Sequence, residues 1–286
     1  MKDFLTSLLN SRLAPDRRAW LARAQEMLAD PAQKARASEY YAAASRKLGK
    51  QALLLDHRER EQLRALSPLL PLDHWGVDEA ARAVLLLALT DLPAGQFAET
   101  AVECYEVGDS REQQSWLRGL SLLPGCKRFL STAIDGCRTN IVPLFESIAC
   151  ENPYPCLYFP DLNFDQMVLK SLFNGIAISR IVGLESRFNA ELSRMADDYA
   201  SEREAAGRQV PIDIWLVVAP RIPAPRLDRV FRYLHHENPQ HRYWAAVGMG
   251  HTGSGAGRTE LEKRRSIESE PEVLRAIETS LERLAR

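Results

Sequence analysis

Short apolar stretches with helical spacing, each ended by proline or glycine, follow one another along most of this chain. Asp78–Leu92 ends at Pro93, and Gly95–Val107 ends at Gly108. Apolar side chains at every third or fourth position form one face of a helix, and that face must be buried against a neighbour. Only Asp213–Val218 could form a buried strand, and its flanking prolines suit a short helix equally well. The sequence therefore predicts an all-α fold.

Two segments far apart in the chain share one pattern and indicate a repeated helical unit. In Asp109–Leu123 and in Asn238–Gly250, a turn and a capping residue precede a polar first turn and then an apolar stripe led by tryptophan. Asp109 and Glu112 have the spacing of a capping box. We expect an irregular helical array of antiparallel helix pairs, stacked as in HEAT-like α-solenoids. An irregular helical domain without repeats remains open.

Changes in composition divide the chain into four parts. Residues 1–70 carry many charges and predict an N-terminal helical region, whereas residues 71–250 predict a core of shorter, repeat-like helices. Residues 251–270 are first rich in glycine and serine and then highly charged, which predicts a flexible linker. Residues 271–286 carry apolar side chains at helical spacing and predict a terminal amphipathic helix.

Charge and apolar run length exclude several classes of partner. The formal net charge is −1, so no global attraction to nucleic acid or to an anionic membrane is expected. The longest apolar runs, Val84–Leu89 and Ile214–Ala219, are much shorter than the roughly 18 residues of a membrane-spanning helix. The segment before Trp20 lacks the apolar length of a signal peptide. The five cysteines include no CxxC pair, and we expect free thiols in a reducing cytoplasm.

Two motifs near the C-terminus carry little chemistry. Gly248–Gly253 fits GxGxxG, but a dinucleotide fingerprint needs a strand before it, and here the preceding segment is helical in pattern. Ala256 stands where a P-loop would have lysine, so we expect a flexible linker rather than a phosphate site. Four histidines cluster in the same region: His235, His236, His241 and His251. They lack HExxH spacing, and we predict ordinary helix-end and loop histidines, with no metal and no cofactor.

The least ordinary stretch is Glu151–Gly175. Its prolines predict an extended segment, which carries Tyr154 and Tyr158. A helix is then expected to begin near Asn163, and most of its circumference is apolar, as in a buried helix. Apart from Asp165 and Ser171, its polar side chains fall within an arc of about 80°: they are Asn163, Gln166, Lys170 and Asn174. Because buried amides and amines need hydrogen-bond partners, this line predicts a surface for a ligand or a partner.

Helix capping explains part of the same polar line. Asn163 and Gln166 have the spacing of an N-cap residue and its reciprocal partner. Asn174 precedes Gly175, as at many helix ends. Lys170 could extend its amine to the surface. Both interpretations remain open.

The next segment, Ile176–Ala206, is predicted as one long helix that Gly207 ends. Arg180 and Arg187 share a face with acidic side chains, which is typical of a solvated face. Alternatively, the two arginines and Lys170 form a basic pocket for a phosphate or a carboxylate. The candidate binding residues are Asn163, Gln166, Lys170, Asn174, Arg180, Arg187, Tyr154 and Tyr158, and no catalytic residue is identified.

Three segments carry a family resemblance: ENPYPCLYFPDLNFDQMVLKSLFNG, RIVGLESRFNAELSRMADDYASEREAAGRQVPIDIW and HRYWAAVGMG. The chain resembles the EboA family of bacterial proteins, most specifically over residues 151–216. The resemblance implies a cytoplasmic accessory protein, encoded beside prenyltransferase-like and sugar-phosphate-enzyme-like proteins. It further implies a role in the production or movement of a secondary metabolite, isoprenoid-linked, toward the cell envelope. It implies no catalytic residue.

Three functional hypotheses follow. The first is a non-catalytic accessory or scaffold protein that binds a partner enzyme or an isoprenoid-linked metabolite between Asn163 and Arg194. The second is a cofactor-independent transferase or lyase that acts on a phosphorylated or prenylated intermediate through Lys170 and nearby arginines. The third is a purely structural scaffold in which the polar stripe belongs to the core. The expected partners are proteins of the same gene cluster and such a metabolite, not nucleic acid.

Overall fold

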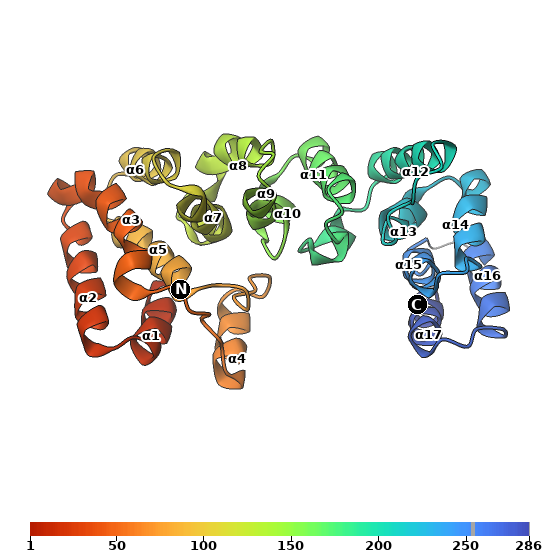
Figure 1. The fold of residues 1–286 in the computed structure, drawn as a ribbon, viewed down its shortest axis with the longest axis horizontal. Helices are drawn as coiled ribbons and strands as arrows, with labels where there is room; N and C mark the ends of the chain where they lie inside the picture. The colour runs from red at the N-terminus through yellow and green to blue at the C-terminus, as the bar shows by residue number, and fades with distance from the viewer. Residues whose placement is uncertain (253–254, 286) are drawn as a thin grey trace. The chain divides into compact units, whose positions relative to one another are not determined.

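The computed structural model describes residues 1–252 and 255–285, and over these ranges the protein is all-helical (Figure 1). Within them there is no strand, only an isolated bridge between Ala52 and Gly76. The all-α prediction is therefore confirmed. Gly253, which completes the GxGxxG match, lies outside the described residues, as does part of the predicted linker. No described helix is long and apolar enough to cross a membrane.

The chain forms two compact units, Met1–Asn163 and Phe164–Arg286. The division falls inside helix α11 (Asp161–Phe173). The five cysteines are free thiols.

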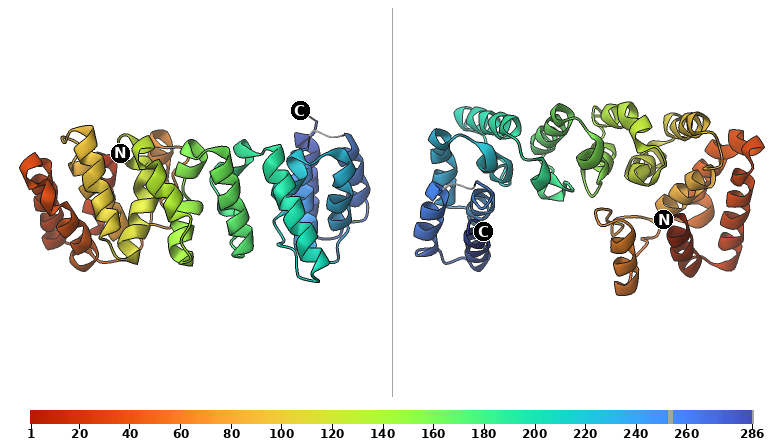
Figure 2. Two further views of the ribbon diagram at one scale, coloured as in Figure 1. Left: turned by 90° about the horizontal axis from the view of Figure 1, so that it is seen from above. Right: turned by 180° about the vertical axis from the view of Figure 1, so that it is seen from behind.

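The other helices of the first unit are α1 (Lys2–Arg12), α2 (Pro15–Ala29), α3 (Ala37–Leu48), α4 (His57–Leu66), α5 (Val77–Ala88), α6 (Ala94–Glu106), α7 (Ser110–Gly119), α8 (Leu130–Gly136), α9 (Val142–Ala149) and α10 (Tyr154–Tyr158). Three 3-10 helices join them: Pro31–Arg36, Leu120–Leu122 and Cys126–Phe129. The helices lie alongside one another, as Figure 2 shows.

Helix α5 is the centre of the first unit, and all of its residues are buried. It packs against α1, α2, α3 and α7, and α7 continues the packing onto α9. Asp109 and Glu112 form the predicted capping box at the start of α7, since each side chain accepts the other's backbone N–H. Helix α4 projects from one side of this unit (Figure 1) and is tied to α1, because Arg12 donates to Glu59 at 3.0 Å. Leu66 at its C-terminal end is exposed.

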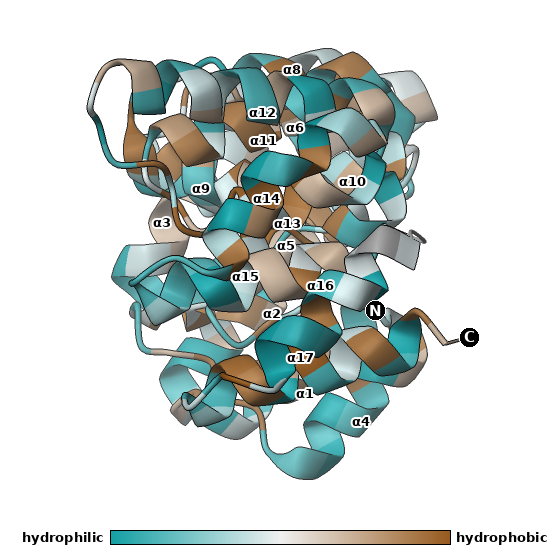
Figure 3. Ribbon diagram, turned by 90° about the vertical axis from the view of Figure 1, so that its right-hand side faces the viewer, coloured by the Kyte–Doolittle hydropathy of each residue, from teal (hydrophilic) through white to brown (hydrophobic). Residues whose placement is uncertain are grey.

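The helices of the second unit after α11 are α12 (Ala190–Ala205), α13 (Trp215–Val218), α14 (Leu227–Leu234), α15 (Pro239–Met249), α16 (Gly255–Arg265) and α17 (Pro271–Arg283). Four 3-10 helices accompany them: Ile178–Arg180, Leu184–Arg187, Ala219–Arg221 and Ala224–Arg226. Helix α17 forms where the sequence predicts a terminal amphipathic helix, and Figure 3 shows hydrophobic and hydrophilic segments alternating along it.

Helix α15 is the centre of the second unit and packs against α13, α14 and α17. Two glycines allow this approach. A Cβ atom on Gly248 would lie 2.1 Å from the carbonyl oxygen of Trp215, and one on Gly250 would lie 2.7 Å from the hydroxyl of Ser280. The first two glycines of the GxGxxG match therefore lie at helix-packing contacts. Within the predicted linker 251–270, Gly255–Arg265 forms helix α16.

A buried ion cluster joins α15, α16 and the start of α17. Glu268 accepts hydrogen bonds from Arg242 at 2.8 and 2.9 Å and from Arg264 at 2.9 Å. It also accepts from the backbone N–H groups of Ser269 at 2.9 Å and Glu270 at 3.0 Å. These donors outweigh the burial that would otherwise raise its pKa, and the pKa of Glu268 falls to about 2. The carboxylate is therefore charged at neutral pH.

Two local predictions between residues 151 and 206 are wrong. Tyr154–Tyr158 is a short helix instead of an extended segment, with prolines at its start where proline is tolerated. Ile176–Ala206 is not one helix: two 3-10 helices precede α12, which begins only at Ala190. Gly183 between them has a left-handed φ of 72°, which interrupts any regular helix.

Candidate functional site

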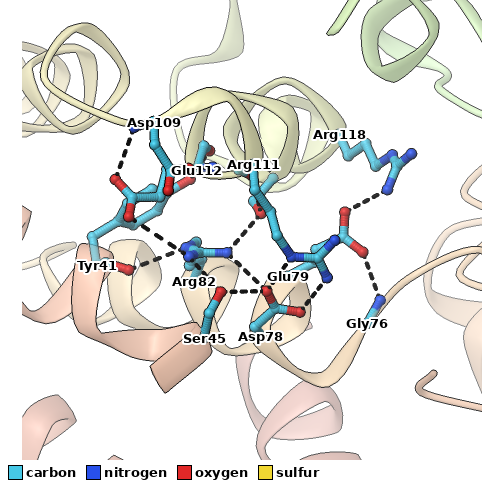
Figure 4. A network of polar contacts seen from close by, with 11 residues as sticks. Tyr41, Ser45, Gly76, Asp78, Glu79, Arg82, Asp109, Arg111, Glu112 and Arg118 are labelled. Carbon is cyan, nitrogen blue, oxygen red and sulfur yellow. Dashed lines mark hydrogen bonds and ion pairs between the residues drawn. The ribbon is translucent and has the colours of Figure 1, made fainter. Parts of the chain in front are cut away.

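Charged side chains are buried between α3, α5 and α7 of the first unit (Figure 4). Arg82 is only 1% exposed. Its guanidinium donates to Asp78 at 3.1 Å, to the hydroxyls of Ser115 at 3.0 Å and Ser45 at 2.9 Å, and to the carbonyl of Tyr41 at 3.1 Å. One side chain thus contacts all three helices.

Asp78 is the carboxylate at the centre of this network. Arg111 donates to both of its oxygens, at 2.6 and 2.7 Å, and the Ser45 hydroxyl donates at 2.6 Å. Burial alone would raise the pKa of Asp78, but the hydrogen bonds from Arg111 and Ser45 and the charge of Arg82 outweigh it. The pKa of Asp78 is therefore lowered and the group stays ionised.

The remaining carboxylates of the network also have protein partners. Glu79 accepts the backbone N–H of Gly76 at 2.6 Å and pairs with Arg118. Glu112 accepts the N–H of Asp109 at 3.1 Å. A network whose charges are satisfied internally connects helices, so we assign it a structural role. The sequence signal was a charged pair four residues apart, Asp78 and Arg82, inside an apolar helix.

Three predicted site residues belong to the first unit. Tyr154 is buried, its hydroxyl donates to the carbonyl of Cys126 at 2.7 Å, and its ring lies 4.8 Å from that of Tyr158. Tyr154 is thus a core residue, which its place in the sequence did not predict. Helix α11 begins at Asp161, two residues before Asn163. The N-cap interpretation of Asn163 is therefore wrong.

The other five predicted site residues belong to the second unit. Gln166 and Asn174 are exposed, and Lys170 on the same helix is half-buried. Gly175, with φ 69°, donates its N–H to Leu172, so the predicted helix end is confirmed.

The two arginines lie on separate 3-10 helices, so they do not share the face of one helix as predicted. Arg180 is exposed and ends Ile178–Arg180, whereas Arg187 ends Leu184–Arg187. The guanidinium of Arg187 lies 4.6 Å from the centroid of the Phe164 ring, a cation–π contact.

A groove of about 530 Å³ lies in the second unit between the C-terminal end of α11 and the segment after α12. We call it the α11–α12 groove. Its walls are Leu172, Phe173, Gly175, Ile176, Ala177, Tyr199, Arg203, Gln209, Val210, Pro211, Ile212, Asp213 and Trp244. Two of its apolar side chains are open to solvent, Phe173 at 74% and Ile212 at 41%. Ligand sites of this size with mainly apolar walls are common in proteins.

One buried carboxylate lies among these apolar walls. Asp213 is 6% exposed and accepts the backbone N–H of Ile178 at 2.7 Å. It forms no ion pair with any residue that the structure describes. Desolvation by burial raises the pKa of Asp213, although the hydrogen bond from Ile178 acts in the opposite direction. A buried carboxyl group without a cation can pair with a hydroxyl or amine of a ligand.

A second polar group of the groove is Arg203, whose Nε donates to the carbonyl of Gln209 at 2.9 Å. That bond uses one of the five guanidinium hydrogens. The groove therefore presents an apolar surface with one carboxyl group and one cation. Sequence reasoning missed the groove because Trp244 comes from α15, which is far in the chain from the other lining residues. The available sequence signal was Asp213 at the edge of an apolar run.

Fold and groove define a class: an all-helical protein with an apolar groove of ligand size. The family model described as "Metabolite traffic protein EboA" matches residues 1–219, and the chain belongs to this family. A comparison with curated proteins found no match, and one with solved structures found none either. The match confirms the resemblance inferred from sequence and includes the N-terminal part. It ends within the second unit, before Trp244.

Proposed function

We propose that the protein is a non-catalytic accessory protein of metabolite traffic that binds an isoprenoid-linked metabolite in the α11–α12 groove. The observation that carries this proposal is the groove itself, whose lining includes the exposed Phe173 and Ile212 and the buried Asp213. An apolar chain with one polar end matches such walls. The family description supports a role in metabolite traffic.

We further propose how the helices are organised, where the protein acts and which partner it has. The helices stack as HEAT-like pairs, and the protein acts in the cytoplasm of a bacterium, with a partner enzyme from the same secondary-metabolite pathway. The polar and basic side chains from Asn163 to Arg187 form the surface for that partner or for the polar end of the metabolite. Lys170 supports this assignment, because it lies on α11, the helix that also carries the groove residue Phe173.

Thermal shift with two prenyl probes tests the groove. Farnesol is the neutral probe and farnesyl diphosphate the anionic one. A probe at about 100 times its Kd stabilises the native state by about 2.7 kcal/mol, which raises Tm by several degrees. We expect Ile212→Asp to abolish the shift, because it places a second carboxylate beside Asp213 in an apolar wall.

The matched control is Ile267→Asp, at an exposed isoleucine of the same unit outside the groove. It should keep the shift. The proposal is wrong if the unchanged protein responds to neither probe, or if both variants respond equally. Lys170→Ala addresses the basic surface: it should reduce the shift with farnesyl diphosphate and leave the shift with farnesol unchanged.

A further inference from the structure

A second cavity of about 400 Å³ lies in the second unit and shares Gln209, Val210 and Ile212 with the α11–α12 groove. Its polar lining includes Arg208, His236, Asn238 and His241, and the ring of Tyr233 covers one side. We call it the histidine pocket. These polar residues do not line the α11–α12 groove, and the two histidines come from the cluster that the sequence indicated.

The hydrogen bonds of both imidazoles fix which nitrogen carries the proton. The indole N–H of Trp215 donates to Nδ1 of His241 at 3.0 Å, and the backbone N–H of Asn238 donates to Nδ1 of His236 at 3.0 Å. Both Nδ1 atoms are therefore acceptors, so each neutral ring carries its hydrogen on Nε2. The rings lie 4.6 Å apart.

His241 is 7% exposed, yet its Nε2 forms no hydrogen bond with any described residue. It is also not enclosed, because the buried side-chain atoms without a partner in the described ranges are Ser121 Oγ and Arg229 Nε. His241 lines the histidine pocket, and we infer that its Nε2–H opens onto this cavity. Burial and the neighbouring His236 lower the pKa of His241 to about 4, so at neutral pH the ring is an uncharged donor.

Two further features add positive potential to the histidine pocket. Asn238 caps helix α15, whose eleven residues direct the positive end of the helix dipole toward this lining. Arg208 is exposed and has no ion pair among the described residues. Glu237, also exposed, is the one carboxylate of the lining. The hydrogen-bond donors of the lining therefore outnumber its single carboxylate.

We propose that the histidine pocket binds an oxyanion, a phosphate or a carboxylate group, through the Nε2–H groups of His236 and His241 with Arg208 as the cation. Protonated Nε2 atoms cannot coordinate a metal but donate well to anionic oxygens. The stacking of Tyr233 on His236, at an interplanar angle of 2°, holds the second donor in place. None of these three side chains lines the apolar groove, so the site would bind an anion that has no apolar part.

Calorimetric titration of the full chain with inorganic phosphate and, separately, with acetate tests the site and distinguishes the two oxyanions. We expect one of them to bind with a Kd near 1 mM or below. His236→Phe keeps the ring but removes the donor, and Arg208→Gln removes the cation; each should weaken binding at least about tenfold. His235→Phe is the matched control, because His235 faces Glu260 instead and should leave binding unchanged.

The imidazole ¹⁵N resonances report on His241 without a substitution that could disturb the core. The Nε2 resonances of His236 and His241 should shift on addition of the bound anion, while those of His235 stay fixed. The proposal is overturned if neither anion binds at roughly 10 mM, if His236→Phe and Arg208→Gln bind as the unchanged protein does, or if the shifts appear at His235 alone. None of these outcomes depends on binding of a prenyl probe.

Discussion

Glu268 shows how much one side chain can contribute, because its carboxylate accepts hydrogen bonds from two arginines and two backbone N–H groups. Its pKa of about 2 in the folded protein compares with an ordinary value of 4.5. A lowered pKa stabilises the folded state above the ordinary value, and this contribution is lost as pH falls through the folded-state value. The sensitive window is therefore about pH 4.5 to 2, and the contribution is on the order of 3 kcal/mol.

Glu268→Gln should therefore lower the free energy of unfolding at pH 7, and the gap to the unchanged protein should close between pH 4.5 and 2. Urea unfolding at several pH values, followed by tryptophan fluorescence, measures the gap. Glu262→Gln, at an exposed glutamate of α16, should show no gap. A gap that stays constant down to pH 2 would contradict the assignment.

Arg82 makes a comparable prediction for the first unit. Arg82→Met removes one partner of the buried Asp78 and should cost about 3–5 kcal/mol, although Arg111 remains paired. The exposed pair of Arg60 and Asp73 serves as control, and Arg60→Met should cost less than about 1 kcal/mol. Urea unfolding followed by far-UV circular dichroism compares the two. Equal costs would show that burial of the network contributes nothing.

At the scale of helices, α15 can approach α13 closely because Gly248 has no side chain. Gly248→Ala would force its Cβ against the backbone of Trp215, and overpacking of this kind costs typically 1–3 kcal/mol. Gly255→Ala is the control, since a Cβ there meets nothing within 4 Å. Thermal unfolding should show a lower Tm for the first variant alone. An unchanged Tm for Gly248→Ala would mean that the helices can separate without loss.

Helices with local start and stop signals were predictable, and those fixed by distant contacts were not. The capping box at Asp109 and the glycine at 175 are local, and the structure confirms both. The segment after Ile176 has the composition of a helix, but the N–H of Ile178 bonds to Asp213, 35 residues away, and Gly183 interrupts the chain with a left-handed φ. Likewise α16 forms in a charged segment because Leu261 is buried and Glu268 holds it.

At the scale of the whole molecule, the candidate site was the least predictable part. The groove joins residues from 172 to 213 with Trp244, and nothing in the local pattern of α15 indicates that its tryptophan lines a groove with them. The basic group around Lys170 came from a helical projection that holds for α11 and fails for the two arginines. Packing between residues distant in the sequence determines both the lining of the groove and the positions of the two arginines.

The second unit also predicts how a shortened chain behaves. A chain that ends at Ala219, where the family match ends, retains Trp215 but lacks His241 and all of α15. Trp215 is fully buried in the complete protein. Without its partners it should become solvent-exposed, with red-shifted fluorescence and fast hydrogen exchange over α12 and α13, whereas exchange in α5 and α7 should be unchanged. Slow exchange over α13 in the shortened chain would contradict this dependence.

The contact of Gly248 with the carbonyl of Trp215 also constrains how such proteins diverge. Trp215 lies inside the segment that matches the family model, and Gly248 lies beyond it. The close approach of the two residues therefore links a residue outside the matched segment to one inside it. A relative that carries a larger residue at the position of Gly248 must also move or lose the turn at Trp215. Retention of glycine at this position would therefore mark which members keep the same second unit, including the walls of its groove.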